Sequence, residues 1–197
     1  MKKRTVFKSG LGLILLFLTI NLNAQNEKLP IDTSKSEINW TGEYAFYFGG
    51  HEGTIDFKEG HFIKTGDLIT GGEFIIDMTS ISSTDIDDPK GRKSLDDHLK
   101  NEDFFEVNNF SEAKLTITYV EYETSQKIKV NANLTIKGIT KPINFRADLD
   151  FNKKQMKTKF KIDRTLWGIT FNSKEVEGKL KDGLISDAIG FEALIVL

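Results

Sequence analysis

The amino-acid sequence predicts an all-β fold of antiparallel strands, and three observations support this. Apolar and polar residues alternate with a period of two along most of the chain, as in strands with one buried and one wet face. Short loops such as 152–154 separate the alternating runs and suit hairpins. Pro, which interrupts strand pairing, occurs only 3 times. So many consecutive strands must close into a barrel or stack as a sandwich, because open sheet edges invite aggregation.

The alternating runs predict the individual strands in chain order. Within each run, every second residue is apolar or aromatic, and the residues between are mostly polar or charged. The runs cover residues 38–48, 54–58, 73–78, 113–119, 129–137, 143–151, 156–163 and 189–197.

One stretch, residues 79–110, breaks the alternation and predicts a helix. Ser94 followed by Asp97 resembles a capping box, and Leu95 and Leu99 share one helical face. We therefore expect a short helix from about Ser94 to Asp103 that caps a barrel end or packs on the side of the barrel.

The N-terminal segment is typical of a secretory signal peptide. Basic residues at positions 2, 3, 4 and 8 precede an apolar stretch at 11–20, and Ala24 provides a small residue for cleavage. We predict cleavage after Ala24, which makes residues 25–197 one periplasmic or secreted domain. The stretch is short for a membrane span, so we expect no stable membrane insertion, with an uncleaved anchor as the alternative. Without a cysteine, the chain cannot be an acylated lipoprotein.

Composition narrows the partners of the mature domain. The predicted signal peptide holds four of the 27 basic residues and none of the 29 acidic ones, so its removal takes the formal net charge from −2 to −6. A mildly acidic body argues against nucleic acid as a partner. Because the chain has no disulfides, its stability must come from packing. The sequence leaves the oligomeric state open, with a homodimer as one possibility.

Motifs of common enzymes and cofactor sites are missing from the sequence. It contains no GxSxG, Walker A, GxGxxG or HExxH motif. A zinc site built from His51, His61 and a carboxylate is geometrically open but lacks the usual ligand spacing. The segment 85–96 faintly resembles a calcium loop, but Pro89 occupies a ligand position. We therefore predict no enzyme activity, no metal and no cofactor.

The apolar faces of the strands are rich in aromatic side chains. Of 15 Phe residues, all but Phe7 and Phe17 follow Ala24. A small barrel can leave room for one ligand, and an apolar wall selects a hydrocarbon. A filled barrel, in which the same side chains form an ordinary core, is the alternative. We expect the tunnel to be lined by Trp40, Phe46, Phe48, Ile55, Phe57, Phe74, Ile76, Leu115, Ile117, Leu134, Phe145, Phe160 and Phe191.

Three polar residues, His51, His98 and Arg164, are candidates for the mouth of this tunnel. Arg164 could pair with a ligand headgroup. Alternatively, it could pair with Asp163 or another carboxylate and serve only to order the barrel rim. His98 lies near the predicted helix and could order the entrance loop.

Five segments of the sequence resemble a known family. These segments are His51–Phe57, Gly71–Ile81, Leu95–Phe105, Leu134–Pro142 and Ile162–Ile169. These segments occur in the same order as in the YceI-like family of secreted, lipocalin-like, polyisoprenoid-binding proteins, which the chain resembles from about Ile31 to the C-terminus. The resemblance implies an eight-stranded antiparallel barrel with a helix beside it, a long isoprenoid or similar amphiphile inside, and a bacterial extracytoplasmic location. Ser111 departs from the family's usual Pro.

The leading hypothesis is therefore an extracytoplasmic carrier of a polyisoprenoid or similar amphiphilic lipid. A ligand-free barrel that acts as an interaction or stress-response module is the second hypothesis, and the volume of the barrel interior discriminates the two. A third hypothesis is an enzyme that acts on a lipid, with His51 or His98 as general base. The sequence places no nucleophile beside either histidine.

Overall fold

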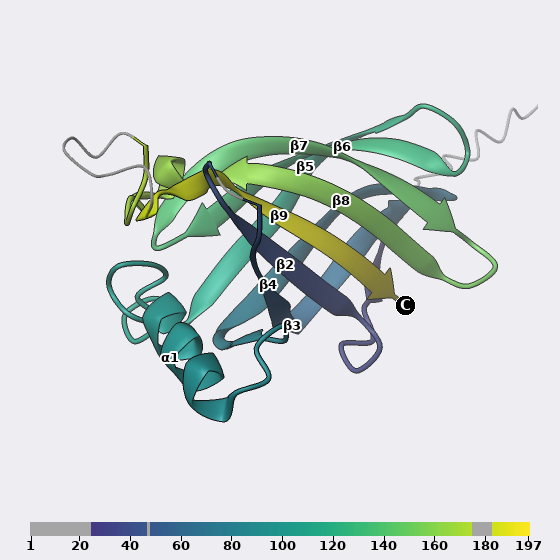
Figure 1. The fold of residues 1–197 in the computed structure, drawn as a ribbon. Coiled ribbons are helices and arrows are strands. Elements are labelled where there is room, and N and C mark those ends of the chain that lie inside the picture. The colour runs from purple at the N-terminus through teal and green to yellow at the C-terminus, as the bar shows by residue number, and fades with distance from the viewer. Residues whose placement is uncertain (1–24, 47, 175–182) are drawn as a thin grey trace, which may run out of the picture.

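Hydrogen-bonded strands close into a ring in the computed structural model, which describes residues 25–46, 48–174 and 183–197 (Figure 1). The predicted signal peptide and its cleavage after Ala24 lie outside the described residues. The elements are β1 (Asn26–Pro30), β2 (Glu37–Tyr44), β3 (Gly50–Thr65), β4 (Leu68–Ser83), α1 (Pro89–Lys100), β5 (Glu112–Tyr122), β6 (Lys127–Ile136), β7 (Ile139–Asp150), β8 (Gln155–Asp163), the 3-10 helix η1 (Arg164–Trp167) and β9 (Ile185–Val196).

Strands β2 to β9 form the closed ring. Each pairs antiparallel with its neighbours in the order β3-β2-β9-β8-β7-β6-β5-β4, and β4 pairs back onto β3. This confirms the predicted eight-stranded antiparallel barrel and excludes the sandwich. Closure gives every strand of the ring a partner on both sides.

The sheet also contains a ninth strand, β1, which the alternation did not predict. Strand β3 is 16 residues long and outlasts its pairing with β2, so its second half offers a free edge. β1 covers that edge between the pairs Asn26↔Thr65 and Pro30↔His61. Its sequence, NEKLP, is charged and ends in Pro, as expected for a short edge strand rather than for a half-buried one.

The period-two pattern becomes the barrel core. In β6, every second side chain from Ile128 to Ile136 is buried. Removing such a side chain from water stabilises the fold by about 1.5–3 kcal/mol. The same parity in the neighbouring strands directs the apolar face of the whole sheet inward.

Helix α1 begins at Pro89, five residues before the predicted start. Its N-cap is Asp88, whose side chain accepts a hydrogen bond from Gly91 N at 2.8 Å, and Pro89 occupies the first turn. The capping box predicted at Ser94 and Asp97 is therefore wrong, because an acidic N-cap followed by Pro is the stronger start signal. Asp97 instead pairs with Lys93 at 2.6 Å along the helix.

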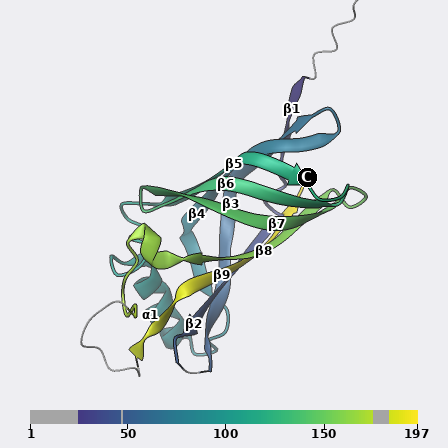
Figure 2. The same cartoon turned by 90° about the horizontal axis from the view of Figure 1, so that it is seen from above.

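Figures 1 and 2 place α1 at one end of the barrel and β1 toward the other. Asp96 holds the helix against the end of β4. Its carboxylate accepts hydrogen bonds from Ser83 N at 2.7 Å, Ser83 Oγ at 2.8 Å and Ser82 Oγ at 3.0 Å. Because Ser83 is buried, these bonds satisfy polar groups that water does not reach.

We expect Asp96→Ala to lower the free energy of unfolding by about 2–4 kcal/mol, because it leaves buried donors of Ser83 without an acceptor. The control is Asp97→Ala, which removes the neighbouring carboxylate from the exposed face of the same helix. Urea unfolding of both variants measures the difference. Equal stabilities would contradict the role of Asp96.

Gly53 allows β2, β3 and β4 to approach closely beneath Trp40. A Cβ at this position would lie 1.9 Å from the carbonyl oxygen of Ser82 and 2.7 Å from the Trp40 ring. A backbone carbonyl cannot move away as a flexible side chain can, so any larger residue forces the strands apart.

Gly53→Ala should therefore destabilise the fold by about 3 kcal/mol. Gly42→Ala on β2 is the matched control, since a Cβ there meets nothing within 4 Å. Denaturant midpoints of the two variants give the comparison, and a well-folded Gly53→Ala protein of unchanged midpoint would disprove the close approach.

Candidate ligand-binding cavity

An internal cavity of about 150 Å³ lies inside the barrel. All eight strands of the ring contribute to its wall, and Leu99, Phe104 and Phe105 close it at the helix end. Among the described residues on the wall, the polar ones are Thr158, Arg164 and Ser186. The enclosed surface is therefore suited to a hydrocarbon.

Several inward-facing side chains are only partly buried, which follows from the empty space they border. Leu115, Phe160 and Phe191 face inward and line the cavity, yet none is fully buried. The barrel interior is thus hollow rather than filled. Its volume resembles that of an engineered apolar cavity that holds benzene, and is below the roughly 300–1,000 Å³ of ordinary ligand pockets.

Aromatic rings form a continuous strip along one side of the cavity. Phe145 and Phe160 stack with centroids 4.8 Å apart, and Phe160 lies 5.7 Å from Phe191. Trp40 continues the strip, because it pairs in register with Phe191. Such ring pairs stabilise a fold by about 0.5–1.5 kcal/mol in addition to the contribution of their buried area, so they help to hold this side of the wall in place.

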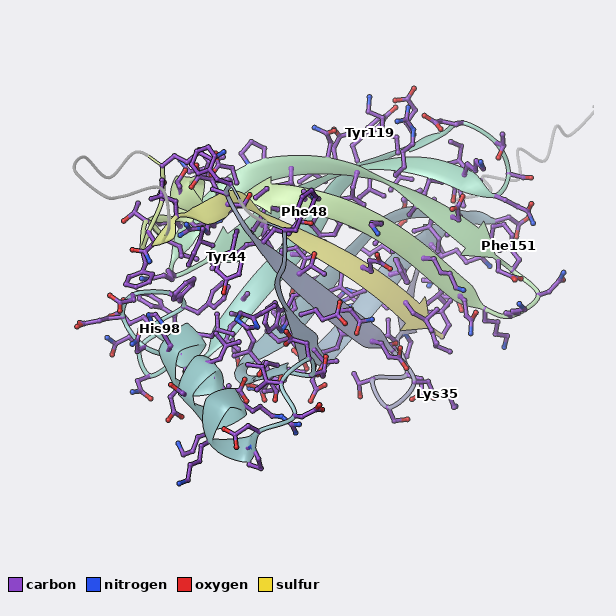
Figure 3. All side chains as sticks on the ribbon, in the orientation of Figure 1. Lys35, Tyr44, Phe48, His98, Tyr119 and Phe151 are labelled. Atoms are coloured by element: carbon purple, nitrogen blue, oxygen red, sulfur yellow. The ribbon has the colours of Figure 1, made fainter. Side chains whose placement is uncertain are left out.

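Eleven of the thirteen side chains predicted for the tunnel lie on this wall. The prediction is wrong for Phe46 and Phe48, which are 53% and 108% exposed. Strand β2 ends at Tyr44 after a register shift. The alternation continues in the sequence beyond this point, but it no longer indicates which side chains face the barrel interior. Side chains of Phe48 and of the neighbouring Tyr44 project from the outside of the barrel (Figure 3).

The wall also contains residues that the sequence analysis missed. Ile38, Met78, Ile189 and Ile195 share the parity of predicted wall residues on their own strands, so alternation was a sufficient signal for them. In contrast, Leu99, Phe104 and Phe105 come from α1 and the turn after it. No periodicity indicates which barrel end a helix covers.

Arg164 reaches the cavity wall, but most of its side chain is used to hold the backbone together. It is fully buried. Its Nε donates to the carbonyl of Ser186 at 3.0 Å, Nη1 to that of Ile169 at 2.8 Å, and Nη2 to that of Ile185 at 3.3 Å. These bonds join η1 to the start of β9 at the helix end of the barrel.

Burial disfavours the charged form of the Arg164 guanidinium, and nearby carboxylates favour it. Burial lowers the pKa of the guanidinium, and the charges of Asp187 and Asp163 raise it in return. Asp187 Oδ1 lies 3.8 Å from Nη2. The side chain of Asp163 does not pair with Arg164. It accepts hydrogen bonds from Thr165 and so caps the N-terminus of η1. Arginine stays protonated in proteins, so a fixed positive charge lies beside the apolar cavity.

We expect Arg164→Lys to cost about 2–4 kcal/mol of stability, because an ammonium cannot reproduce the planar fork that bonds three carbonyls. Arg146→Lys is the control, since Arg146 is exposed and its side chain pairs with Glu123. Thermal unfolding compares the two. A stable Arg164→Lys protein that merely loses ligand would instead favour a headgroup role for this residue.

His98 lies one layer behind the cavity wall at the helix end (Figure 3). Its ring makes edge contacts with Phe104 at 5.0 Å and Phe171 at 4.7 Å, and its Nε2 is 3.2 Å from Asp103 Oδ2. Phe104 separates it from the cavity, so His98 supports the wall rather than forming it.

His51 keeps the inward parity of β3 but lies at the barrel rim, beyond the cavity wall. Its Nδ1 is 2.9 Å from Asp85 Oδ2. Burial favours a higher pKa for Asp85, but the hydrogen bonds from His51 and from backbone N–H groups outweigh it and lower that pKa. The two predicted mouth histidines are therefore held by aspartates at the helix end, outside the cavity.

The arrangement of His51, His61 and a carboxylate that the sequence left open does not form. Both histidines lie on β3, ten residues and roughly 30 Å apart. Within residues 25–46, 48–174 and 183–197, no group of three His, Asp or Glu side chains is placed to hold a metal ion. In the same ranges, no helix is both long and apolar enough to cross a lipid bilayer.

A closed antiparallel barrel around an apolar cavity, with a helix across one end, defines the class of lipocalin-like barrel proteins. Residues 29–197 match the YceI-like domain, and the chain belongs to this family.

Individual relatives agree with this assignment. A UPF0312 protein of Vibrio parahaemolyticus is 27% identical over 157 residues, which cover 74% of this chain and 74% of that protein. A UPF0312 protein of Photorhabdus laumondii is 31% identical over 150 residues, covering 76% of this chain and 73% of that protein.

Solved structures share the fold at lower identity. BcnA of Burkholderia cenocepacia matches with a TM-score of 0.65 at 16% identity, covering 84% of this chain and 98% of BcnA. A YceI protein of Campylobacter jejuni matches with a TM-score of 0.50 at 18% identity, covering 100% of this chain and 98% of that chain. At these identities the structures support the fold alone.

Proposed function

We propose that the protein is an extracytoplasmic carrier that binds one hydrophobic small molecule, a polyisoprenoid or similar amphiphilic lipid, inside the barrel. The observation that carries this proposal is the hollow, apolar cavity to which all eight ring strands contribute. Membership of the YceI-like family supports it. Signal-like residues 1–24 support a periplasmic or secreted location.

Binding energetics favour a long ligand. Each buried methylene contributes about 0.8 kcal/mol, so ten contribute roughly 8 kcal/mol before losses. Association costs about 4–15 kcal/mol in lost freedom. A short hydrocarbon therefore binds weakly in this barrel, and the binding free energy improves with each further isoprene unit that the interior takes up.

We propose binding rather than catalysis. His51 and His98 each contact an aspartate, but neither lies on the cavity wall, so neither reaches a molecule held in the cavity as a general base must. The acidic mature domain makes nucleic acid an unfavourable partner. A homodimer stays a prediction.

The modest cavity volume favours one alternative, a ligand-free barrel that serves as an interaction or stress-response module. The two proposals differ in what the purified protein contains. Native mass spectrometry of protein from its own host, followed by organic extraction, should give a bound species of long-chain mass. A clean apo mass that farnesol does not change would favour the ligand-free module.

Filling the cavity should abolish binding without unfolding the protein. Ala193→Phe on β9 places a ring in the cavity, and we expect farnesol affinity to fall by roughly tenfold or more through lost burial. Glu192→Phe adds the same ring to the outer face of the same strand and is the control. Equal affinities in the two variants would count against a site inside the barrel.

The proposed export is tested separately by the mass of the mature protein. We expect a chain that begins at Gln25, because cleavage follows Ala24. Mass spectrometry of the exported protein measures this directly, and an intact Met1 would contradict cleavage.

A further inference from the structure

A second hollow lies at the barrel end opposite α1. Its volume is about 110 Å³. It is floored by apolar side chains, including those of Leu29, Phe62, Ile69 and Leu149, and Lys64, Asp67, Asp150 and Lys154 stand among its lining residues. Leu29 on β1 and Leu197, which follows β9, both line this hollow.

Met156 is shared by the central cavity and this second hollow. Its side chain lies on the lining of both. It is buried, at the start of β8, and pairs in register with Leu149 on β7 and Ile195 on β9. One thioether side chain therefore stands between two apolar spaces.

The volumes indicate why this partition matters. The central cavity of about 150 Å³ and the second hollow of about 110 Å³ are each too small for a typical lipid-sized ligand. Together they approach the lower bound of roughly 300 Å³ for ordinary ligand pockets. Methionine is unbranched and has three rotatable bonds, so it adapts its shape more readily than Ile or Phe.

We propose that Met156 is the partition that sets ligand length: a chain longer than the central cavity displaces this side chain and continues into the second hollow. The inference rests on the proposed lipid-binding function and specifies its ligand as a slender isoprenoid chain that is longer than the central cavity. The tail of that chain occupies the space between Phe62, Ile69 and Leu149. Charged residues around the hollow mark the outer limit for an apolar tail.

The test compares three isoprenoid alcohols of one chemistry and increasing length: geraniol, farnesol and geranylgeraniol. Affinities are measured by displacement of a fluorescent fatty acid from the full mature chain. Met156→Ala opens the partition, so the ratio of geranylgeraniol to farnesol affinity should rise by about tenfold over that of the wild type, through added burial. Met156→Val, a milder change suited to a strand, should raise the same ratio by a smaller factor.

Ile195→Ala is the matched control. Ile195 pairs with Met156 and lines the central cavity, but it does not reach the second hollow. Its truncation enlarges the cavity without opening the partition, so all three alcohols should change together. Thermal unfolding of each variant checks that the fold is retained.

The outcomes separate this inference from the proposed function. A wild-type protein that binds none of the alcohols overturns the proposed function itself. A wild-type protein that binds them, with the same length preference in Met156→Ala and Ile195→Ala, overturns the partition alone. A length preference that shifts only in the two Met156 variants supports it.

Discussion

Backbone pairing between β3 and β4, and between β2 and β9, converts a nine-stranded sheet into a closed ring, and the other features depend on it. Closure satisfies the hydrogen bonds of strands that would otherwise present free edges. It also fixes which face of every strand points inward, so a period of two in the sequence becomes an apolar wall in space. The cavity exists because eight strands enclose a width that their own side chains fill only partly.

Alternation in the sequence was enough to predict the barrel wall, and its errors have local causes. Trp40 and Phe191 were placed correctly because their strands are regular and paired on both sides. Phe46 and Phe48 were misplaced because alternating residues continue past the point where β2 ends. The helix start was misassigned because Asp88 and Pro89 read equally well as a loop. β1 was missed because a charged edge strand has no apolar face to detect.

Polar chemistry at the helix end was the least predictable part of the candidate site. A single Arg in the sequence does not reveal whether its guanidinium faces a ligand or a set of carbonyls. In the structure, three backbone carbonyls accept hydrogen bonds from Arg164. The main role of this side chain is therefore to hold the backbone at the helix end together, although it also borders the cavity. His98 supports Phe104 from behind in a similar way. The resulting site is selective through shape and apolar surface more than through directed polar contacts.

The position of β9 has a consequence for how the protein reaches this state. β9 lies between β2 and β8, and a hydrogen bond from Val196 N to Ser36 Oγ joins residues 160 positions apart. Such non-local pairing raises contact order, and chains of this kind fold slowly, in milliseconds to seconds. Until β9 has been synthesised, β2 and β8 have no partner between them. The ring of strands therefore cannot close until the C-terminal strand is available to pair.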